Sequence, residues 1–339
     1  MRTDFVIIGA GPAGSAAAIH ARRFGLSVVL LEASSRFRPA PGETLHPGVE
    51  PLFEQLGIRD AVLAGQFHRH RGIWIEWDGP RRFESYGEDD RGPWRGFQAD
   101  RERLHTILLQ AAVDAGAELV RPASPVAVLR DGVRVAGVEA DGLRFFARWT
   151  ADATGRRAWL ARALELREER HSPPLYVRFG WNRDERADLD GQPLFAAHEQ
   201  GWNWQAPLGD RTAWAELRID DAAERPPGGQ GADLSWRIHR DSAGPGYFLL
   251  GDAAATLDPA SSHGVLRALM SGVLAAHLAA GCVNRDLPEP VAFEEYRNWC
   301  EQQFETDIHA LRTLYAKHPA ESVARAFAQV QSGKPGLLC

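Results

Sequence analysis

Apolar runs and runs of small residues alternate along the first part of the chain. Phe5 to Ile8 and Ser27 to Leu31 are short, largely apolar segments, and this pattern predicts two buried strands. Pro12 to Arg23 lies between them and is rich in alanine, which predicts a helix of small residues. The three elements form a βαβ unit, for which a right-handed crossover is expected.

Helical and strand patterns also alternate further along the chain. A strand is predicted at Ala117 to Val120, and Phe293 to Gln331 has the pattern of a helical surface hairpin. Helical spacing of apolar side chains precedes that strand, at Leu104, Ile107, Leu108 and Ala111. Tryptophan and tyrosine concentrate in segments patterned as a sheet with one buried face, namely GIWIEW, RRFESY, PLYVRFGW, GWNWQAPL and TAWAELRI.

This order of elements predicts an α/β fold with interleaved domains. We expect a discontinuous, Rossmann-like nucleotide-binding domain, a smaller antiparallel-sheet domain for the substrate, and a C-terminal helical segment. The nucleotide-binding domain comprises residues 1–65, 95–165 and 245–285. The substrate domain comprises residues 66–94 and 166–244, and the C-terminal segment comprises residues 286–339.

Composition narrows the setting in which the protein works. The 339 residues carry a formal net charge of −6 without a basic tail, so no nucleic-acid partner is expected. Ala268 to Ala280 is the most apolar later run but is too short to span a bilayer, so we expect a core helix and no membrane span. We expect no metal, because metal-ligand spacing is lacking among Cys282, Cys300 and Cys339. Their odd number argues against a disulfide framework, so we expect a reduced, cytoplasmic setting.

A glycine motif follows the first predicted strand and opens the first helix. In GAGPAG, Gly9 permits a tight turn, Gly11 lets a pyrophosphate approach the backbone, and Gly14 lets helix and strand pack closely. Glu32 ends the second strand at the spacing where a carboxylate accepts hydrogen bonds from ribose hydroxyls. Because that carboxylate would repel a 2′-phosphate, the motif predicts FAD or NAD rather than NADP.

Two later motifs distinguish these cofactors. TADATGR at Thr150 to Arg156 ends in a small-residue turn, and YFLLGDAAATLDP is a buried strand that runs into Gly251 and Asp252. With the glycine motif, these resemble the FAD-dependent oxidoreductases of the p-hydroxybenzoate-hydroxylase fold. The resemblance implies FAD, with Asp252 bonding its ribityl–pyrophosphate part and Arg101 approaching it; Arg101 as a solvated first-turn residue is the alternative. The expected FAD-binding residues are Gly9, Gly11, Pro12, Ala13, Gly14, Glu32, Ala33, Glu43, Arg101, Gly155, Gly251, Asp252, Gly264 and Val265.

The stretch LDPASSHGVLRALMSG places small polar residues before a glycine and an apolar helix. In the family that it resembles, the start of this helix points at the isoalloxazine ring, near N1 and C2=O. Gly264 and Val265 would donate their N–H groups there and stabilise the negative charge of reduced flavin. The alternative is a helix that is capped by Ser261 or Ser262 and binds nothing.

Other segments suggest a branch of that family. GETLHPGVEPLFEQLGI resembles the branch with flavin halogenases, geranylgeranyl reductases and LodB/GoxB-type flavoproteins, which modify tryptophan in partner proteins during quinone-cofactor maturation. DPxSSxGVLxALMSG and the C-terminal YRNWCEQQFETDIHALRTLYA look most like the LodB/GoxB type. We expect halogenase activity to be disfavoured, because the chain has no lysine before Lys317 and has His263 where halogenases have threonine.

The resemblance implies an FAD-dependent monooxygenase. Reduced FAD would capture O2 as a C4a-hydroperoxide, which an electron-rich aromatic ring attacks. The ring belongs to a small molecule or to a tryptophan in a partner polypeptide, and electrons come from NAD(P)H or a separate flavin reductase. The alternatives are a geranylgeranyl-reductase-like flavin reductase and a flavin-binding maturation chaperone without turnover.

The candidate catalytic residues surround the expected flavin edge. His263 and Ser262 lie in the SSHG corner, and His46 is a further candidate proton handler, as are His68 and His70. Asp258 is either a second acid or the start of an Asx turn. In GWNWQAPL, Trp202 and Trp204 face the same side of their strand. They form either a wall of the substrate cavity or part of the ordinary core.

Overall fold

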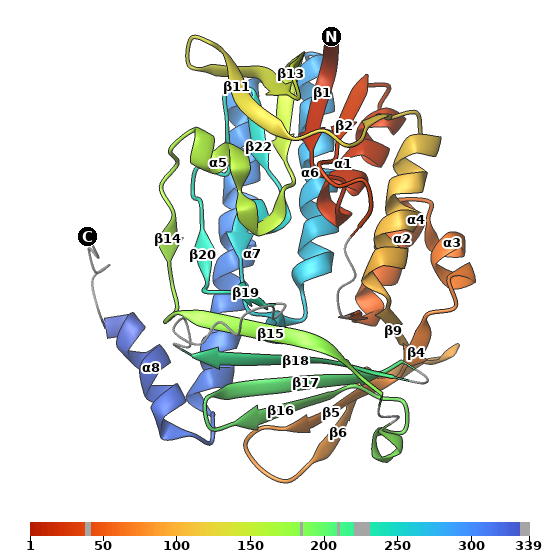
Figure 1. The fold of residues 1–339 in the computed structure, drawn as a ribbon, viewed down its shortest axis with the longest axis vertical. Helices are drawn as coiled ribbons and strands as arrows, with labels where there is room; N and C mark the ends of the chain where they lie inside the picture. The colour runs from red at the N-terminus through yellow and green to blue at the C-terminus, as the bar shows by residue number, and fades with distance from the viewer. Residues whose placement is uncertain (38–41, 184–185, 209–210, 220–230, 333–339) are drawn as a thin grey trace.

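Two large sheets form the frame of the molecule, one above the other in Figure 1. The computed structural model describes residues 1–37, 42–183, 186–208, 211–219 and 231–332. Residues 220–230 of the expected substrate domain and 333–339 of the expected C-terminal segment therefore lie outside the described residues.

The upper sheet has eight strands in the part of the chain that the structure describes. Its order is β10-β2-β1-β13-β12-β11, with β22 also paired to β13 and β21 to β22. The run β10-β2-β1-β13-β22 is parallel, as the predicted βαβ unit requires. The strands are β1 (Arg2–Ile8), β2 (Val28–Leu31), β10 (Glu118–Val120), β11 (Pro125–Asp131), β12 (Arg134–Ala140), β13 (Leu143–Asp152), β21 (Ala243–Gly244) and β22 (Tyr247–Leu249).

Alternation of side chains along β1 and β2 explains why both strands are apolar throughout. Phe5 and Ile7 pack into the large core cluster under the helices, whereas Val6 and Ile8 pack into a second cluster with Phe145. The parallel sheet is thus buried on both faces. Its helical layer consists of α1 (Pro12–Arg23), α4 (Arg101–Asp114) and α6 (Gly264–Val283). The predicted α/β fold with a Rossmann-like FAD-binding part is confirmed.

Small residues let α1 and α6 pack closely. A Cβ at Gly272 of α6 would lie only 2.2 Å from the backbone oxygen of Ala13 in the first turn of α1. The position of this first turn, which follows the glycine motif, therefore depends on the absence of a side chain at Gly272.

Replacing Gly272 with alanine is expected to lower the free energy of unfolding by about 1–3 kcal/mol, because α6 must shift away from α1. Gly281→Ala on the same helix is the control, because its Cβ would meet the Leu287 side chain, at 3.2 Å, rather than backbone. We expect that change to stay within about 1 kcal/mol. Urea denaturation measures both, and equal losses would contradict the close-packing argument.

The expected core helix is longer than the apolar run that predicted it. We expected the apolar run Ala268 to Ala280 to be too short to span a bilayer. The helix that contains it, α6, has 20 residues and by length and composition alone could cross a membrane, so this expectation is corrected. However, 56% of its most apolar window is buried inside the protein. The core helix of a soluble protein has these properties, and here Leu269, Ala276 and Leu278 belong to the main core.

The lower sheet has seven described strands in the order β19-β15-β18-β17-β16-β5-β6. All five aromatic segments contribute strands to it. The bounds are β5 (Gly72–Glu76), β6 (Arg82–Ser85), β15 (Leu175–Asn182), β16 (Leu194–His198), β17 (Gly201–Pro207), β18 (Thr212–Ile219) and β19 (Gly231–Asp233). One face packs against two C-terminal helices, α7 (Glu289–Ala316) and α8 (Glu321–Ser332), through a cluster that includes Trp202, Phe304 and Tyr315.

Short elements connect the two sheets. β3-β9-β4 and β14-β20-β23 are three-stranded, and β7-β8 is a hairpin. Their bounds are β3 (Glu43–Leu45), β4 (His68–His70), β7 (Glu88–Asp89), β8 (Gly92–Pro93), β9 (Gly96–Ala99), β14 (Glu169–Arg170), β20 (Arg237–Ile238) and β23 (Ala255–Thr256). The short helices are α2 (Glu50–Gln55), α3 (Arg59–Ala64), α5 (Trp159–Ala163), η1 (Pro47–Val49), η2 (Gly155–Arg157), η3 (Ala187–Leu189), η4 (Gly251–Ala253) and η5 (Pro259–Ser261).

Candidate functional site

The glycine motif leaves an open space before the first helix. Gly9 has φ of +102° and a Cβ there would lie 2.4 Å from the Ala153 oxygen, while a Cβ at Gly14 would lie 1.9 Å from the Gly9 oxygen. A Cβ at Gly11, in contrast, would meet nothing within 4 Å. Among the described residues, no side chain caps α1. Its first N–H groups are therefore free to bind an anion such as a pyrophosphate.

Glu32 is held beside this turn at the end of β2. One carboxylate oxygen accepts a hydrogen bond from the Ala10 N–H at 3.0 Å, and the other accepts one from the Ser34 N–H at 2.8 Å. Each oxygen keeps a second lone pair for a ribose hydroxyl. Ala33, the next residue, is exposed.

Four charged side chains from separate elements meet further along the site. Arg101, the first residue of α4, places its Nε 3.2 Å from a carboxylate oxygen of Glu43 on β3. Burial raises the pKa of Glu43; Arg101 opposes that rise, and the charge of Asp252 in η4 adds to it. About a quarter of the Glu43 side chain is still accessible. Arg156 in η2 is also close enough to Glu43 and Asp252 to interact with their charges.

The turn that carries Gly155 and Arg156 depends on a buried acid that sequence reasoning passed over. Asp152 accepts hydrogen bonds from the Thr154 N–H at 2.8 Å and from the Leu160 N–H at 2.7 Å. Burial raises the pKa of Asp152, and these bonds to the carboxylate oppose that shift. It is the one acid of TADATGR and the last residue of β13, at the buried end of that strand, and this position is the signal that could have identified it.

The start of α6 provides a second open helix terminus. A Cβ at Gly264 would meet nothing within 4 Å, and Val265 follows it in the first turn. His263, rather than Ser261 or Ser262, occupies the N-cap position, and no described side chain caps the helix. Ser262 has φ of +56°, an uncommon conformation for a residue with a side chain. The alternative of a serine-capped helix is therefore not what the structure shows.

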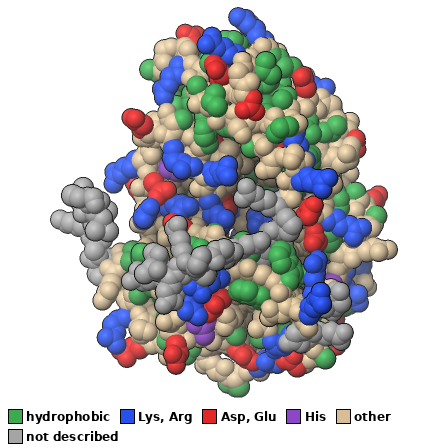
Figure 2. Space-filling model, in the orientation of Figure 1, with side chains coloured by type: hydrophobic (Ala, Val, Ile, Leu, Met, Phe, Trp, Pro, Cys, Tyr) green, Lys and Arg blue, Asp and Glu red, His purple; other side chains and the backbone are tan. Residues whose placement is uncertain are grey.

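These features fit FAD. An open helix start suits its pyrophosphate, Glu32 suits the ribose, and Arg101 with Arg156 supplies positive charge. The open start of α6 suits an anionic ring edge. Figure 2 shows Lys and Arg side chains gathered across the middle of the displayed face, and Arg156 and Arg157 are both exposed.

Comparison with known proteins agrees with this geometry. Residues 4–164 match the family described as "FAD dependent oxidoreductase". Over this stretch, which is just under half of the chain, the protein resembles the FAD-dependent oxidoreductases. A tryptophan 2-halogenase of Chondromyces crocatus is 27% identical, with 89% of this chain and 66% of the relative covered, so the match spans just under two thirds of that halogenase. A menaquinone reductase of Mycolicibacterium smegmatis is 29% identical, with 87% and 81% covered.

Solved structures of similar proteins share the fold of this oxidoreductase. The myxobacterial chondrochloren halogenase CndH has a TM-score of 0.85 at 23% identity, with 99% of this chain and 91% of that chain covered. The peptidyl tryptophan dihydroxylase QhpG has a TM-score of 0.76 at 21% identity, with 100% and 80% covered. The resemblance that the motifs indicated is therefore confirmed, and the chain is similar to oxidoreductases of the halogenase and monooxygenase branch.

The comparisons correct the expectation about halogenation. Besides the tryptophan 2-halogenase, a carrier-protein-bound pyrrole brominase of Pseudoalteromonas luteoviolacea is 26% identical over 90% of this chain. The inference that halogenase activity is disfavoured was therefore wrong. It relied on a missing lysine and one altered motif, whereas the similarity extends over most of the chain. A cationic side chain can reach a cavity from a residue that is distant in sequence, so a linear motif is a poor test.

Three candidate residues gather at the start of α6. Burial, and then the charge of His263, lowers the pKa of His46, so these two imidazoles are neighbours. His46 also packs edge-on against Tyr86, with 4.8 Å between the ring centroids. Trp204 on β17 is half-buried, and its indole N–H donates to the Thr44 hydroxyl at 3.0 Å. Thr44 lies on β3 next to Glu43, so one strand connects the cofactor residues with the aromatic ones.

Other candidates lie deeper in the protein. Trp202 is 1% exposed and packs in the core between the lower sheet and helices α7 and α8, rather than on an open wall. Its N–H donates to the Tyr315 hydroxyl at 3.1 Å, and Tyr315 in turn donates to the buried Asp258 carboxylate. Asp258 also accepts from the Ala260 N–H at 2.8 Å, which is the Asx turn that its sequence suggested. Burial raises the pKa of Asp258 to about 6.

His68 and His70 have structural surroundings. A ring nitrogen of His68 lies 2.6 Å from the Gly191 carbonyl oxygen. His70 is fully buried on β4, and burial lowers its pKa to about 4. Its imidazole is therefore neutral near pH 7, and its partner is the Gly72 carbonyl at 3.2 Å.

Proposed function

We propose that this FAD-dependent oxidoreductase oxygenates an electron-rich aromatic ring, and that the ring is the indole of a tryptophan in a partner polypeptide. Bound FAD would supply the electron transfer and the activation of O2. The protein's own residues would orient the ring, exclude water and accept the proton that the ring carbon releases.

The observation that carries this proposal is the position of β3 between the two parts of the site. Glu43 on β3 pairs with Arg101 on the cofactor side. Thr44 accepts a hydrogen bond from the Trp204 indole. His46, two residues further along the chain, is a neighbour of His263. An aromatic substrate in this place would contact aromatic and imidazole rings while lying next to the open start of α6.

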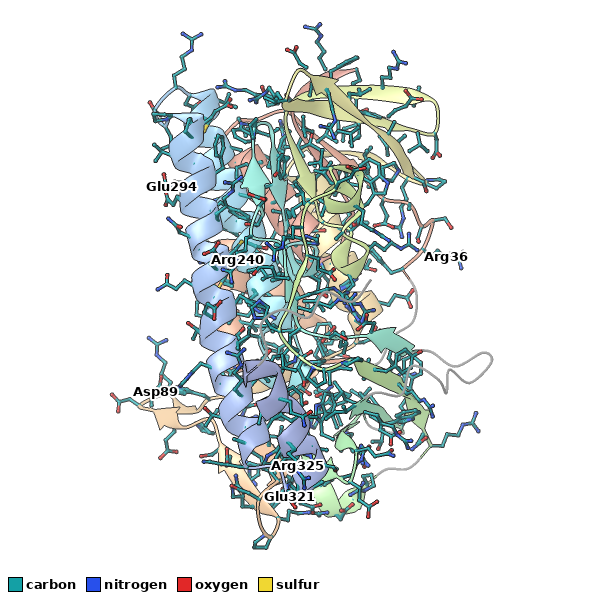
Figure 3. All side chains as sticks on the ribbon, turned by 90° about the vertical axis from the view of Figure 1, so that its left-hand side faces the viewer. Arg36, Asp89, Arg240, Glu294, Glu321 and Arg325 are labelled. Carbon is teal, nitrogen blue, oxygen red and sulfur yellow. The ribbon has the colours of Figure 1, made fainter. Side chains whose placement is uncertain are left out.

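A polypeptide substrate is supported by the shape of the surface beside Tyr86. The β7–β8 hairpin follows Tyr86 and projects from the molecule, with Asp89 near its tip in Figure 3. Trp94 at its base is 45% exposed, which is unusual for so large an apolar side chain. An exposed aromatic residue next to a reactive site suits contact with a protein partner. QhpG, whose fold is similar, is described as acting on peptidyl tryptophan.

Halogenation of the same kind of ring is the second candidate. It is favoured by the tryptophan 2-halogenase and the pyrrole brominase among the relatives. Both candidates require reduced flavin, O2 and an electron-rich ring, so the same site serves either one. They differ in whether halide is consumed.

One experiment separates the candidates. The FAD-loaded protein is reduced anaerobically, with NADH, NADPH or an added flavin reductase as three separate sources of electrons. It is then mixed with O2 and a tryptophan-containing peptide, with and without bromide, and the peptide is analysed by mass spectrometry. We expect addition of oxygen in both halves. A brominated product that forms only with bromide would favour the second candidate, and an unchanged peptide would contradict both.

A further inference from the structure

Helix α7 brings one buried carboxylate to the start of α6. Asp307 is 6% exposed, and it lies on the apolar face of α7 with Phe304 and Leu311. One of its oxygens lies 2.8 Å from Nδ1 of His263. The other lies 3.2 Å from Nε of Arg267, one turn further along α6.

This contact determines which nitrogen of His263 carries hydrogen. A carboxylate can only accept hydrogen bonds, so Nδ1 must be the protonated nitrogen that donates to Asp307. In the neutral ring, the lone pair is then on Nε2. About half of the His263 side chain is accessible, and in the described part of the chain no protein group is paired with Nε2.

We propose that Asp307 is a positioning residue that holds His263 with Nε2 free to exchange a proton at the open start of α6. Arg267 balances the carboxylate charge and keeps Asp307 an acceptor. The proton released by the aromatic substrate would pass to Nε2 of His263 and leave to solvent from the exposed side of this imidazole ring. Among the described residues, His46 is close enough to interact with the charge of His263, and Arg267 lies on the other oxygen of Asp307. The inference rests on the proposed function, because it assigns His263 a proton of that reaction.

The competing explanation is that Asp307 only joins α6 to α7 through Arg267. The variant Asp307→Asn separates the two. The positive charge of Arg267, 3.2 Å away, favours the amide oxygen on its own side and leaves the amide NH2 facing Nδ1 of His263. That donor would force the hydrogen onto Nε2, which is the wrong tautomer for a proton acceptor. We expect turnover to fall about 100-fold, with FAD binding unchanged.

The tautomer is measured directly by NMR on protein with ¹⁵N-labelled histidine. We expect hydrogen on Nδ1 of His263 in the unaltered protein and on Nε2 in Asp307→Asn. Hydrogen on Nε2 in the unaltered protein would overturn the proposal, and this arm needs no variant to fold. If neither product forms in the unaltered protein, the proposed function fails, while the tautomer still decides the arrangement of Asp307 and His263.

A double variant tests whether Asp307 acts through His263. In a His263→Gln background, Asp307→Asn should cause no additional loss, because the group that it positions is already absent. A full 100-fold loss in that background would show that Asp307 acts on something else.

Discussion

Gly11→Val should abolish FAD binding and leave the protein folded. A Cβ at Gly11 meets nothing within 4 Å of protein, and its φ of −71° is accessible to any residue, so the apoprotein has no reason to rearrange. The new side chain would instead occupy the space before α1 that the pyrophosphate needs in order to reach the helix N–H groups. We expect the Kd for FAD to rise at least about 100-fold, or about 3 kcal/mol.

A titration of apoprotein with FAD, followed by flavin fluorescence, gives this Kd. Gly79→Val is the matched control, because a Cβ at Gly79 also meets nothing within 4 Å but lies in the turn between β5 and β6. That variant should bind FAD as the unaltered protein does. Retention of tight FAD binding by Gly11→Val would mean that the cofactor does not lie before α1.

Asp258→Asn should stabilise the protein increasingly as the pH rises. Burial raises the pKa of Asp258 from 3.8 to about 6, so between these values the folded state holds a proton that the unfolded chain has released. Stability therefore falls as pH rises through this window, and the total loss corresponds to about 3 kcal/mol. Asparagine cannot ionise. Relative to the unaltered protein, the free energy of unfolding of the Asp258→Asn variant should therefore rise by about 3 kcal/mol between pH 4 and 7.

Urea denaturation at several pH values measures this difference and cancels the contributions of other groups. Tyr315→Phe provides a variant with the opposite sign. It removes the hydroxyl that donates to the Asp258 carboxylate and leaves that oxygen with the Trp202 N–H at 3.5 Å. Its deficit in stability should therefore grow with pH. A pH-independent difference for Asp258→Asn would contradict the raised pKa of the buried carboxyl.

Local patterns were sufficient to predict the elements that position the cofactor. The apolar strands, the glycine turn and the helix after it depend on neighbours in sequence, and β1, α1 and β2 occur where they were expected. The same holds for Glu32, which accepts one hydrogen bond from Ala10 in the glycine turn and one from Ser34, two residues further along the chain. The aromatic segments were also recognisable as strands, because alternation along one strand is a local property.

Contacts between distant segments were not predictable in this way. Asp307 meets His263 across 44 positions, and Tyr315 meets Asp258 across 57. The available signal was weak: each polar group lies on an otherwise apolar face of α7, which suggests burial but not a partner. Trp202 shows the same limit, because a strand pattern places two tryptophans on one face without telling which of them packs against a helix. The domain boundaries and residue roles remain predictions.

Helix α7 has a mechanical consequence for the enzyme. Its 28 residues form a rod about 42 Å long, which runs beside both sheets in Figure 3. Near one end Tyr296 donates to the Leu249 carbonyl of the upper sheet at 2.7 Å, and near the other the Leu314 carbonyl accepts from Trp77, beside the lower sheet, at 2.9 Å. Because α7 is bonded to both sheets, it opposes a hinge motion that would move the upper and lower sheets apart. We therefore expect a substrate of the proposed reaction to enter and leave without a hinge motion between the two sheets.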